Sequence, residues 1–227
     1  MITVDNLTLK FNLGRFSTKD KKYFTALKNI NLQINKGEYV GLIGRNGSGK
    51  STLLRVISGI YHPTHGNIKT EGKIKPLLSL EIGSQGELTG LENIYYYSYL
   101  NGIDKKTLNK IITEVIDFAE LGEFINYPLK NYSSGMKVRL FFSILCFTNP
   151  EVLLVDENIM AGDVKFRKKC LSKIIELMKN SSGIFASHSN ELLREFCHKG
   201  LVLEKGEKYF FGEIDEALEK YKMLISN

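Results

Sequence analysis

Residues 44–51 read GRNGSGKS, a spacing of glycine, lysine and hydroxyl residues that suits the binding of a phosphate chain. The glycines allow backbone N–H groups to turn toward phosphate oxygens, and the positive end of a following helix adds to the attraction. Lys50 can reach the β- and γ-phosphates, and the Ser51 hydroxyl can bind Mg²⁺. An ordinary glycine-rich turn is the alternative, but the apolar run before the motif and the helical pattern after it favour a nucleotide-binding loop. Its predicted contact residues are Gly44, Arg45, Asn46, Gly47, Ser48, Gly49, Lys50, Ser51 and Thr52.

Two carboxylates follow a second apolar run, VLLVDE at 152–157. A buried strand there delivers Asp156 to the carboxyl edge of a parallel sheet, where open α/β folds bind ligands. We predict that Asp156 holds Mg²⁺ and that Glu157 orients the attacking water or accepts its proton. The alternative is that the two carboxylates only form surface ion pairs at a strand end. The phosphate loop in the same chain favours the role in Mg²⁺ binding and catalysis.

His188 stands in a comparable position, because it follows the apolar stretch GIFAS. A lone histidine at a strand end is often a simple loop residue. The strand-end argument that places Asp156 also favours a polar contact from His188 to the γ-phosphate.

The elements that must position these residues alternate between strand and helix. Residues 2–43 have the period-two pattern of an N-terminal antiparallel β region, and later strands alternate with amphipathic helices. This order predicts an α/β fold with a mostly parallel sheet covered by helices. A helical block at about 86–135 interrupts the alternation. We predict a single domain over 1–227 with this block inserted into its core.

Composition sets outer limits on the function. The chain has 227 residues, a net charge of +6 and 43% hydrophobic residues, as expected for a globular protein that works near phosphates or an anionic surface. Three widely spaced cysteines give no metal-ligand pattern. The N-terminus lacks the apolar core of a signal peptide, and no apolar run approaches the roughly 20 residues of a membrane-spanning helix. Any membrane role is therefore expected to come through a partner.

The order of these motifs resembles the ATP-binding subunits of ABC transporters. YSSGM at 132–136 stands where that family usually has Leu-Ser-Gly-Gly-Gln, ahead of the strand that ends in Asp-Glu. The resemblance implies an ABC-type P-loop ATPase that uses ATP and Mg²⁺. It also implies a second copy of the chain arranged head to tail, whose nucleotide is contacted by Ser133, Ser134 and Gly135. A helix N-terminus with a free hydroxyl and free N–H groups suits that contact with phosphate.

The resemblance extends to one particular branch of this family. ELTGLENIYYY, DENIMAGD and SHSNELLREFC look like the branch that exports polysaccharides such as capsule, O-antigen and teichoic acid chains. That branch implies a polytopic membrane permease as partner and a peripheral position on the cytoplasmic face of the cell membrane. The lipid-linked polysaccharide would be handled by the complex rather than by this chain. Some members carry an extra C-terminal sugar-binding domain, for which this chain is too short.

Three positions depart from the family pattern. The glutamine expected near Mg²⁺ and water at the entry of the helical block is assigned to Gln85, with Glu81 as the alternative. The Ser-Ala-Leu-Asp loop after the catalytic glutamate reads MAGD here, which leaves Asp163 as its acid. The aromatic residue that stacks on adenine stays open among Phe11, Phe16, Tyr23 and Phe24.

Three other functions compete with transport. An ABC ATPase acting on ribosomes or DNA usually joins two such domains or carries long coiled coils, so we expect no nucleic-acid partner. A P-loop kinase would not need YSSGM before VLLVDE. A regulator without catalysis is disfavoured because Lys50, Asp156, Glu157 and His188 are all present.

Overall fold

The structure of the chain is a computed structural model. The described residues are 1–14, 22–78, 84–100, 102–147, 150–156 and 163–226. They fall into two compact units, each described separately here. The first comprises 1–78, 150–157 and 178–227, and the second comprises 79–149 and 158–177.

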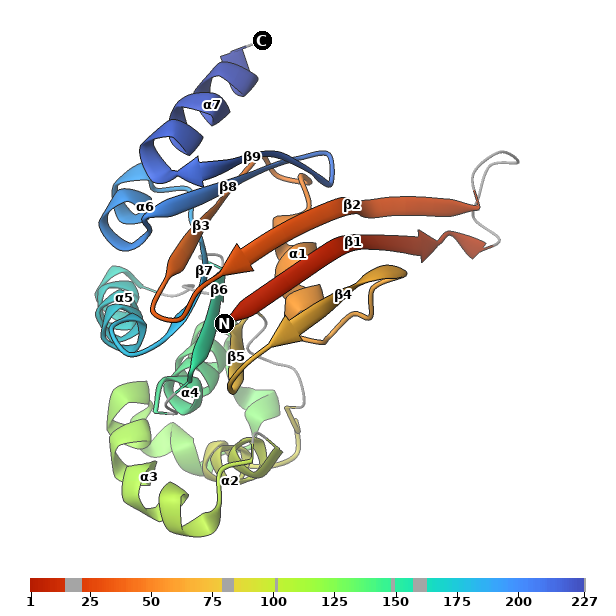
Figure 1. Cartoon of the computed structure of the whole chain (residues 1–227). Coiled ribbons are helices and arrows are strands. Elements are labelled where there is room, and N and C mark those ends of the chain that lie inside the picture. Colours follow the sequence, from red (N-terminus) through yellow and green to blue (C-terminus); the bar gives the residue numbers. More distant parts are fainter. Residues whose placement is uncertain (15–21, 79–83, 101, 148–149, 157–162, 227) are drawn as a thin grey trace. The chain divides into compact units, whose positions relative to one another are not determined.

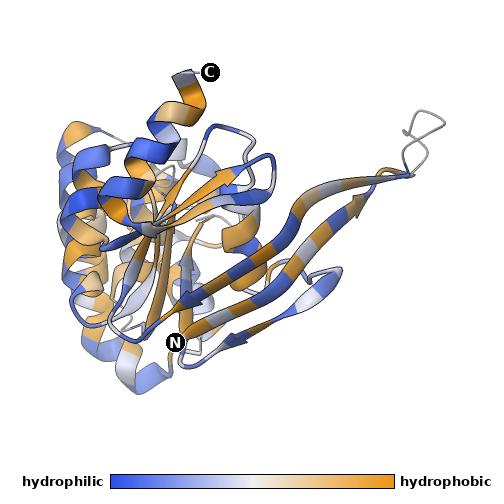
Figure 2. Cartoon of the chain, turned by 45° about the horizontal axis from the view of Figure 1, so that its top comes forward, coloured by the Kyte–Doolittle hydropathy of each residue, from blue (hydrophilic) through white to orange (hydrophobic). Residues whose placement is uncertain are grey.

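The first unit contains two sheets (Figure 1). The smaller one is antiparallel with the order β2-β1-β4, and Figure 2 shows hydrophilic and hydrophobic residues alternating along its long β1–β2 ribbon. This alternation lets one face of the ribbon bury its apolar residues, as the period-two pattern predicted. Its strands are β1 (Ile2–Asn12), β2 (Tyr23–Ile34) and β4 (His65–Thr70).

The larger sheet has six strands in the order β5-β6-β7-β3-β8-β9. All neighbouring pairs are parallel except β8 with β9. Every residue of the central strands β3, β6 and β7 is buried, as expected for parallel strands covered on both faces. The strands are β3 (Tyr39–Ile43), β5 (Ile74–Leu77), β6 (Val152–Asp156), β7 (Ser182–Ala186), β8 (Lys199–Glu204) and β9 (Glu207–Glu213).

Three helices of this unit pack on its sheets. Helix α1 (Lys50–Ile57) contacts β2 and β6, and its buried residues join a core shared with the small sheet. Helices α6 (Asn190–Phe196) and α7 (Ile214–Ser226) contact β3, and α7 also covers β8 and β9. The position of α1 matters most for function, because it begins immediately after the predicted phosphate loop.

The second unit is helical. Helix α3 begins after its N-cap, Asp104, and buries Leu108, Val115 and Ala119. The unit also includes α4 and nearly all of α5, so it extends beyond the 86–135 block expected from the sequence. Its elements are α2 (Gly90–Leu100), α3 (Lys105–Ala119), the 3₁₀ turns η2 (Gly122–Asn126) and η3 (Leu129–Asn131), α4 (Ser134–Cys146) and α5 (Val164–Met178).

Within the described ranges, none of the helices has the length and apolar character required to cross a bilayer.

Candidate functional site

The predicted phosphate loop joins the end of β3 to the start of α1. Gly49 caps α1 with φ +108°, a left-handed conformation that favours glycine. No described side chain caps this helix start. The N–H groups of the first turn are therefore available to an anion, and the helix dipole favours one there.

Lys50 is folded back over the loop that precedes it. Its Nζ donates to the carbonyl oxygens of Gly44 at 2.6 Å and Arg45 at 3.1 Å. Burial lowers the pKa of Lys50, while the nearby Asp156 carboxylate acts in the opposite direction. The Ser48 hydroxyl is buried and has no hydrogen-bond partner within the described structure. A lysine spanning the loop and an unsatisfied buried hydroxyl both fit a phosphate chain as the missing partner.

Ser51 and Asp156 meet across the first unit, although 105 positions separate them in the sequence. The Ser51 hydroxyl donates to Asp156 Oδ2 at 2.7 Å, and Asp156 is 6% exposed. A hydroxyl and a carboxylate side by side offer the oxygen ligands that Mg²⁺ prefers. The pair predicted for the metal is thus brought together, and its chemistry fits that ion.

The strand order brings His188 to the same edge of the sheet. Strand β7 lies between β3 and β6, and Ala186 pairs with both Leu42 and Asp156. His188 follows two residues later and is exposed. It therefore lies beyond the carboxyl end of the strand between the phosphate loop and Asp156, as the strand-end argument predicted.

The YSSGM stretch starts helix α4 in the second unit. Ser133 is the N-cap, and its hydroxyl accepts from the backbone N–H of Met136 at 3.3 Å. Ser133 and Ser134 are exposed, and only the Ser133 hydroxyl, at 3.9 Å, would approach a Cβ placed on Gly135. Tyr132 is buried, and its hydroxyl donates to the Phe124 carbonyl at 2.6 Å. The tyrosine anchors a helix start whose following residues face outward.

Gln85 belongs to the second unit and is exposed. Its backbone N–H donates to Asn93 Oδ1 at 3.0 Å, and Asn93 Nδ2 donates back to its carbonyl at 3.0 Å. The side chain of Asn93 is fully buried, so a satisfied amide fixes the backbone at Gln85. The role assigned to Gln85 remains a prediction, and its alternative, Glu81, lies outside the described residues.

Asp163 has two partners in the structure. One carboxylate oxygen accepts from the Phe166 N–H at 2.9 Å at the start of α5, and the other accepts from Arg139. Hydrogen bonding to that N–H and to Arg139 lowers the pKa of Asp163. The catalytic candidate Glu157 lies outside the described residues.

The aromatic candidates for adenine stacking differ in their surroundings. Phe11 makes an edge-to-face contact with Tyr61, with ring centroids 5.5 Å apart, whereas Phe24 pairs directly across from it and is 57% exposed. Tyr23 is equally exposed, and it pairs with Asn12 at the next position along the ribbon. Phe16 lies outside the described residues.

One support of the phosphate loop was not predicted from the sequence. The Gly206 N–H donates to the Ser48 carbonyl at 2.9 Å, and the Lys28 N–H donates to the Gly206 carbonyl at 2.8 Å. Gly206 has φ +80°, and a Cβ there would collide with the Ala26 carbonyl. The EKGE turn between β8 and β9 gave the only signal, since its glycine indicates a tight turn but not what that turn touches.

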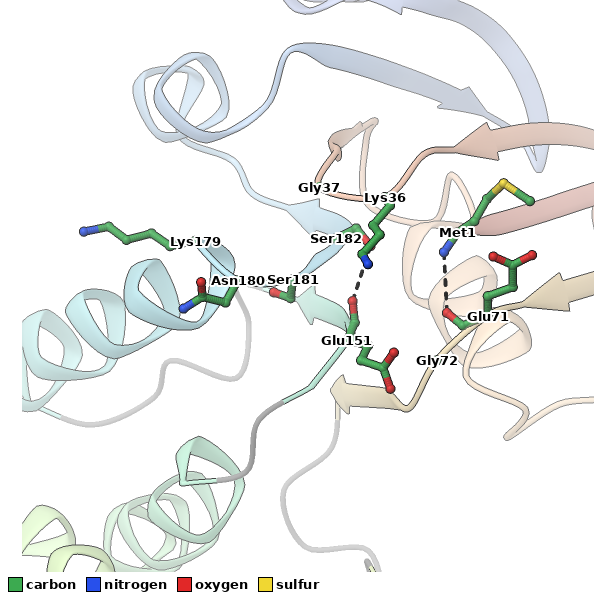
Figure 3. Close-up of a pocket in the computed structure, with 10 residues that line it drawn as sticks. All are labelled: Met1, Lys36, Gly37, Glu71, Gly72, Glu151, Lys179, Asn180, Ser181 and Ser182. Carbon is green, nitrogen blue, oxygen red and sulfur yellow. Dashed lines mark hydrogen bonds between the residues drawn. The ribbon is translucent and has the colours of Figure 1, made fainter.

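A cavity of 480 Å³ lies at the other edge of the large sheet (Figure 3). Glu151 precedes β6 and Ser182 begins β7, so this cavity is at the amino ends of those strands. The Ser182 N–H donates to the Glu151 carbonyl at 3.1 Å, and the amino terminus donates to the Glu71 carbonyl at 3.4 Å. Of the predicted site residues that the structure describes, none lines this cavity, so it is separate from the phosphate loop.

Comparison with known proteins agrees with this geometry. The family model described as ABC transporter matches residues 27–160. The chain belongs to the ABC transporter family. It is 42% identical over 207 residues to the teichoic acids export ATP-binding protein TagH of Staphylococcus saprophyticus, covering 91% of this chain and 78% of that protein. Its identity to the protein of the same name from Staphylococcus haemolyticus is 41%, covering all of this chain and 89% of the relative.

A longer relative also matches. The teichoic acids export ATP-binding protein TagH of Bacillus anthracis is 42% identical over 207 residues, which are 91% of this chain and 38% of that protein. Among solved structures, a dimeric post-hydrolysis state of the ATP-binding cassette MJ0796 bound to ADP and Pi has a TM-score of 0.76 and 25% identity. That match covers 94% of this ABC chain and 99% of the other. The predicted fold class and the predicted ABC-type ATPase subunit are confirmed.

Proposed function

We propose that this chain is the ATP-hydrolysing subunit of an ABC transporter that exports teichoic acid or a related lipid-linked polysaccharide. The observation that carries the proposal is the identity of about 40% that extends over 91–100% of the chain to proteins named for teichoic acid export. The site geometry supports the ATPase part, since a half-buried lysine, an uncapped helix start and a Ser–Asp pair occupy one edge of the sheet.

In this proposal the residues of the phosphate loop bind the nucleotide. The N–H groups at the start of α1 hold the β-phosphate, and Lys50 exchanges its two carbonyl partners for phosphate oxygens. Ser51 and Asp156 hold Mg²⁺, which when bound neutralises charge on the phosphates. His188 contacts the γ-phosphate, and Glu157 orients water with Gln85. Phe11 or Phe24, which share one face of the β1–β2 ribbon, supplies the ring for adenine.

The working form is a head-to-tail dimer of two copies. The dimeric form named for the MJ0796 cassette supports this arrangement. Ser133, Ser134 and Gly135 at the exposed start of α4 contact the nucleotide held by the other copy, and Asp163 supports that interface. A neutral N-cap hydroxyl and a bare glycine suit a contact with phosphate, because neither adds negative charge.

The membrane partner is a polytopic permease, which the chain joins on the cytoplasmic face of the membrane. The names of the relatives support an export complex, and the net charge of +6 suits a surface near anionic lipids.

The experiment is co-expression of the chain with a candidate polytopic permease, followed by reconstitution in vesicles. We expect a stable complex whose Mg²⁺-dependent ATP hydrolysis rises when a lipid-linked polysaccharide is added. Glu157→Gln should keep ATP binding, trap an ATP-bound dimer and stop turnover. Co-purification with ribosomes and never with membranes would contradict the transport proposal, and full turnover by Glu157→Gln would remove that residue from its role.

A further inference from the structure

Arg139 connects three helices of the second unit. It lies in α4, downstream of the YSSGM stretch, and its side chain is 19% exposed. Nη2 binds Asp163 Oδ2 at 2.5 Å, and Nη1 binds Glu120 Oε2 at 3.1 Å. The guanidinium also lies 4.5 Å from the centre of the Phe166 ring. Two carboxylates and an aromatic face therefore fix the orientation of its plane.

Each of these carboxylates belongs to a helix end. Glu120 is the C-cap of α3 and has φ +51°, a left-handed conformation that is uncommon outside glycine. Asp163 accepts the Phe166 N–H at the beginning of α5. Through these two side chains, Arg139 joins α4 to the end of α3 and to the start of α5.

Lys169 completes the cluster from α5. Its Nζ donates to Glu120 Oε1 at 2.7 Å and to the Phe118 carbonyl at 3.0 Å, and it lies 4.4 Å from the centre of the Phe118 ring. Two cations thus face two carboxylates over aromatic rings. An isolated surface ion pair contributes little, but a network with shared, oriented partners holds its geometry better.

We propose that Arg139 is a positioning residue that locks α4 to the start of α5, so that Ser133–Gly135 and Asp163 move as one body. This inference rests on the proposed function, in which the start of α4 contacts the nucleotide of the second copy. The segment ahead of α5 follows Asp156 and Glu157 directly in the sequence. Arg139 thereby couples the exposed start of α4 to Asp163, so we expect both to respond together when the second copy binds.

The first test needs no nucleotide. Hydrogen exchange is measured on the full chain and on Arg139→Met, with Arg167→Met, an exposed arginine on α5, as the matched control. We expect faster exchange at the starts of both α4 and α5 in Arg139→Met alone, with α1 unchanged. Unchanged exchange at α5 would overturn the proposal whether or not the chain hydrolyses ATP.

The second test separates positioning from folding. Arg139→Met should lower kcat about tenfold or more while the Kd for ATP at one subunit changes less than about twofold. Arg139→Lys keeps the charge but not the planar fork, so it should restore only part of kcat. Asp163→Asn should lower kcat similarly, because asparagine still caps α5 but no longer pairs with Arg139.

The outcomes of this test are distinct from those of the export proposal. Normal kcat in folded Arg139→Met, beside an active wild type, would overturn the positioning role and leave the ATPase intact. A parallel loss of kcat and ATP affinity would also overturn it, since that pattern indicates a general structural defect.

Discussion

Helices α1 and α3 both begin with a lysine, yet their starts are built in opposite ways. At α1 the cap is Gly49, no described side chain satisfies the first turn, and Lys50 is folded onto loop carbonyls. At α3 the cap is Asp104, whose Oδ1 accepts the N–H groups of Lys106 and Thr107 at 2.9 Å each, and Lys105 is exposed. At α3, the Asp104 carboxylate already accepts two N–H groups of the first turn. At α1, the first-turn N–H groups have no described side-chain acceptor, so they and Lys50 can bind an external anion.

The start of α4 is intermediate between these two. Its cap is the Ser133 hydroxyl, which accepts one N–H at 3.3 Å and carries no charge. Among these three helix starts, the carboxylate cap is at α3, whereas glycine and serine cap the two starts where phosphate is proposed to bind. Substitutions that exchange these caps test whether the difference is functional.

The largest effect is expected from removing the lysine at α1. Lys50→Ala should lower ATP turnover about 100-fold or more, because it removes the half-buried cation that is proposed to bind the phosphates. Lys105→Ala, the matched change at the first position of α3, should leave turnover unchanged. Turnover assays with Mg²⁺ and ATP on both variants check this, and equal losses would mean that the two helix starts do not differ in function.

Exchanging the caps should give the next largest effect. Ser133→Asp keeps a good N-cap but adds a negative charge, so we expect normal folding, normal ATP binding to one subunit and turnover reduced about tenfold to 100-fold. The reverse change, Asp104→Ser, should preserve turnover. Thermal unfolding, nucleotide binding and turnover are measured for each variant. Normal turnover by Ser133→Asp would leave Ser133 as an ordinary helix cap.

Lowering the pH should destabilise the start of α3, whose cap is a carboxylate, but not the start of α1, whose cap is glycine. Hydrogen bonds from the N–H and hydroxyl of Thr107 lower the pKa of Asp104. A carboxylate with a lowered pKa stabilises the fold above its ordinary value of about 4, and that contribution is lost as pH falls through the folded pKa. NMR of the Thr107 amide should therefore show the α3 start fraying in acid. Asp104→Ser should remove this transition, and its persistence in that variant would assign it to another group.

The smallest effect is expected at the anchor of α4. Tyr132→Phe removes the hydrogen bond to the Phe124 carbonyl but keeps the buried ring, so unfolding should become easier by about 1 kcal/mol. Chemical denaturation measures this change, with turnover expected to stay within about twofold of wild type. A large loss of turnover would mean that the anchor, and not only the cap, sets the proposed contact.

The parts that sequence predicted well are local. GRNGSGKS lies between a strand and a helix, and the short, continuous apolar run before Asp156 is typical of a buried strand, as observed in β6. The direction of parallel strands then brings Ser51 and Asp156 together, as observed at 2.7 Å. The family resemblance was equally accessible, since its motifs appear in a fixed order.

The parts that sequence could not predict depend on long-range packing. No spacing indicates that Asn93 would be buried under the backbone of Gln85, or that Arg139 would join the ends of α3 and α5. The compact helical unit also includes α4 and nearly all of α5, and the sequences of these two helices, taken singly, do not indicate that grouping. Side-chain networks of this kind become visible only when the helices are placed together.

The contact between Gly206 and the phosphate loop has a consequence for how the molecule can be divided. The segment matched by the family model, 27–160, contains the phosphate loop and Asp156 but not the β8–β9 turn, whose Gly206 N–H donates to the Ser48 carbonyl. A fragment ending at residue 160 would keep the sequence motifs but lose the hydrogen bond from Gly206 that supports the phosphate loop. The ends of a minimal ATP-binding fragment should therefore be chosen to keep this hydrogen bond. Such a fragment must include at least the β8–β9 hairpin at 199–213.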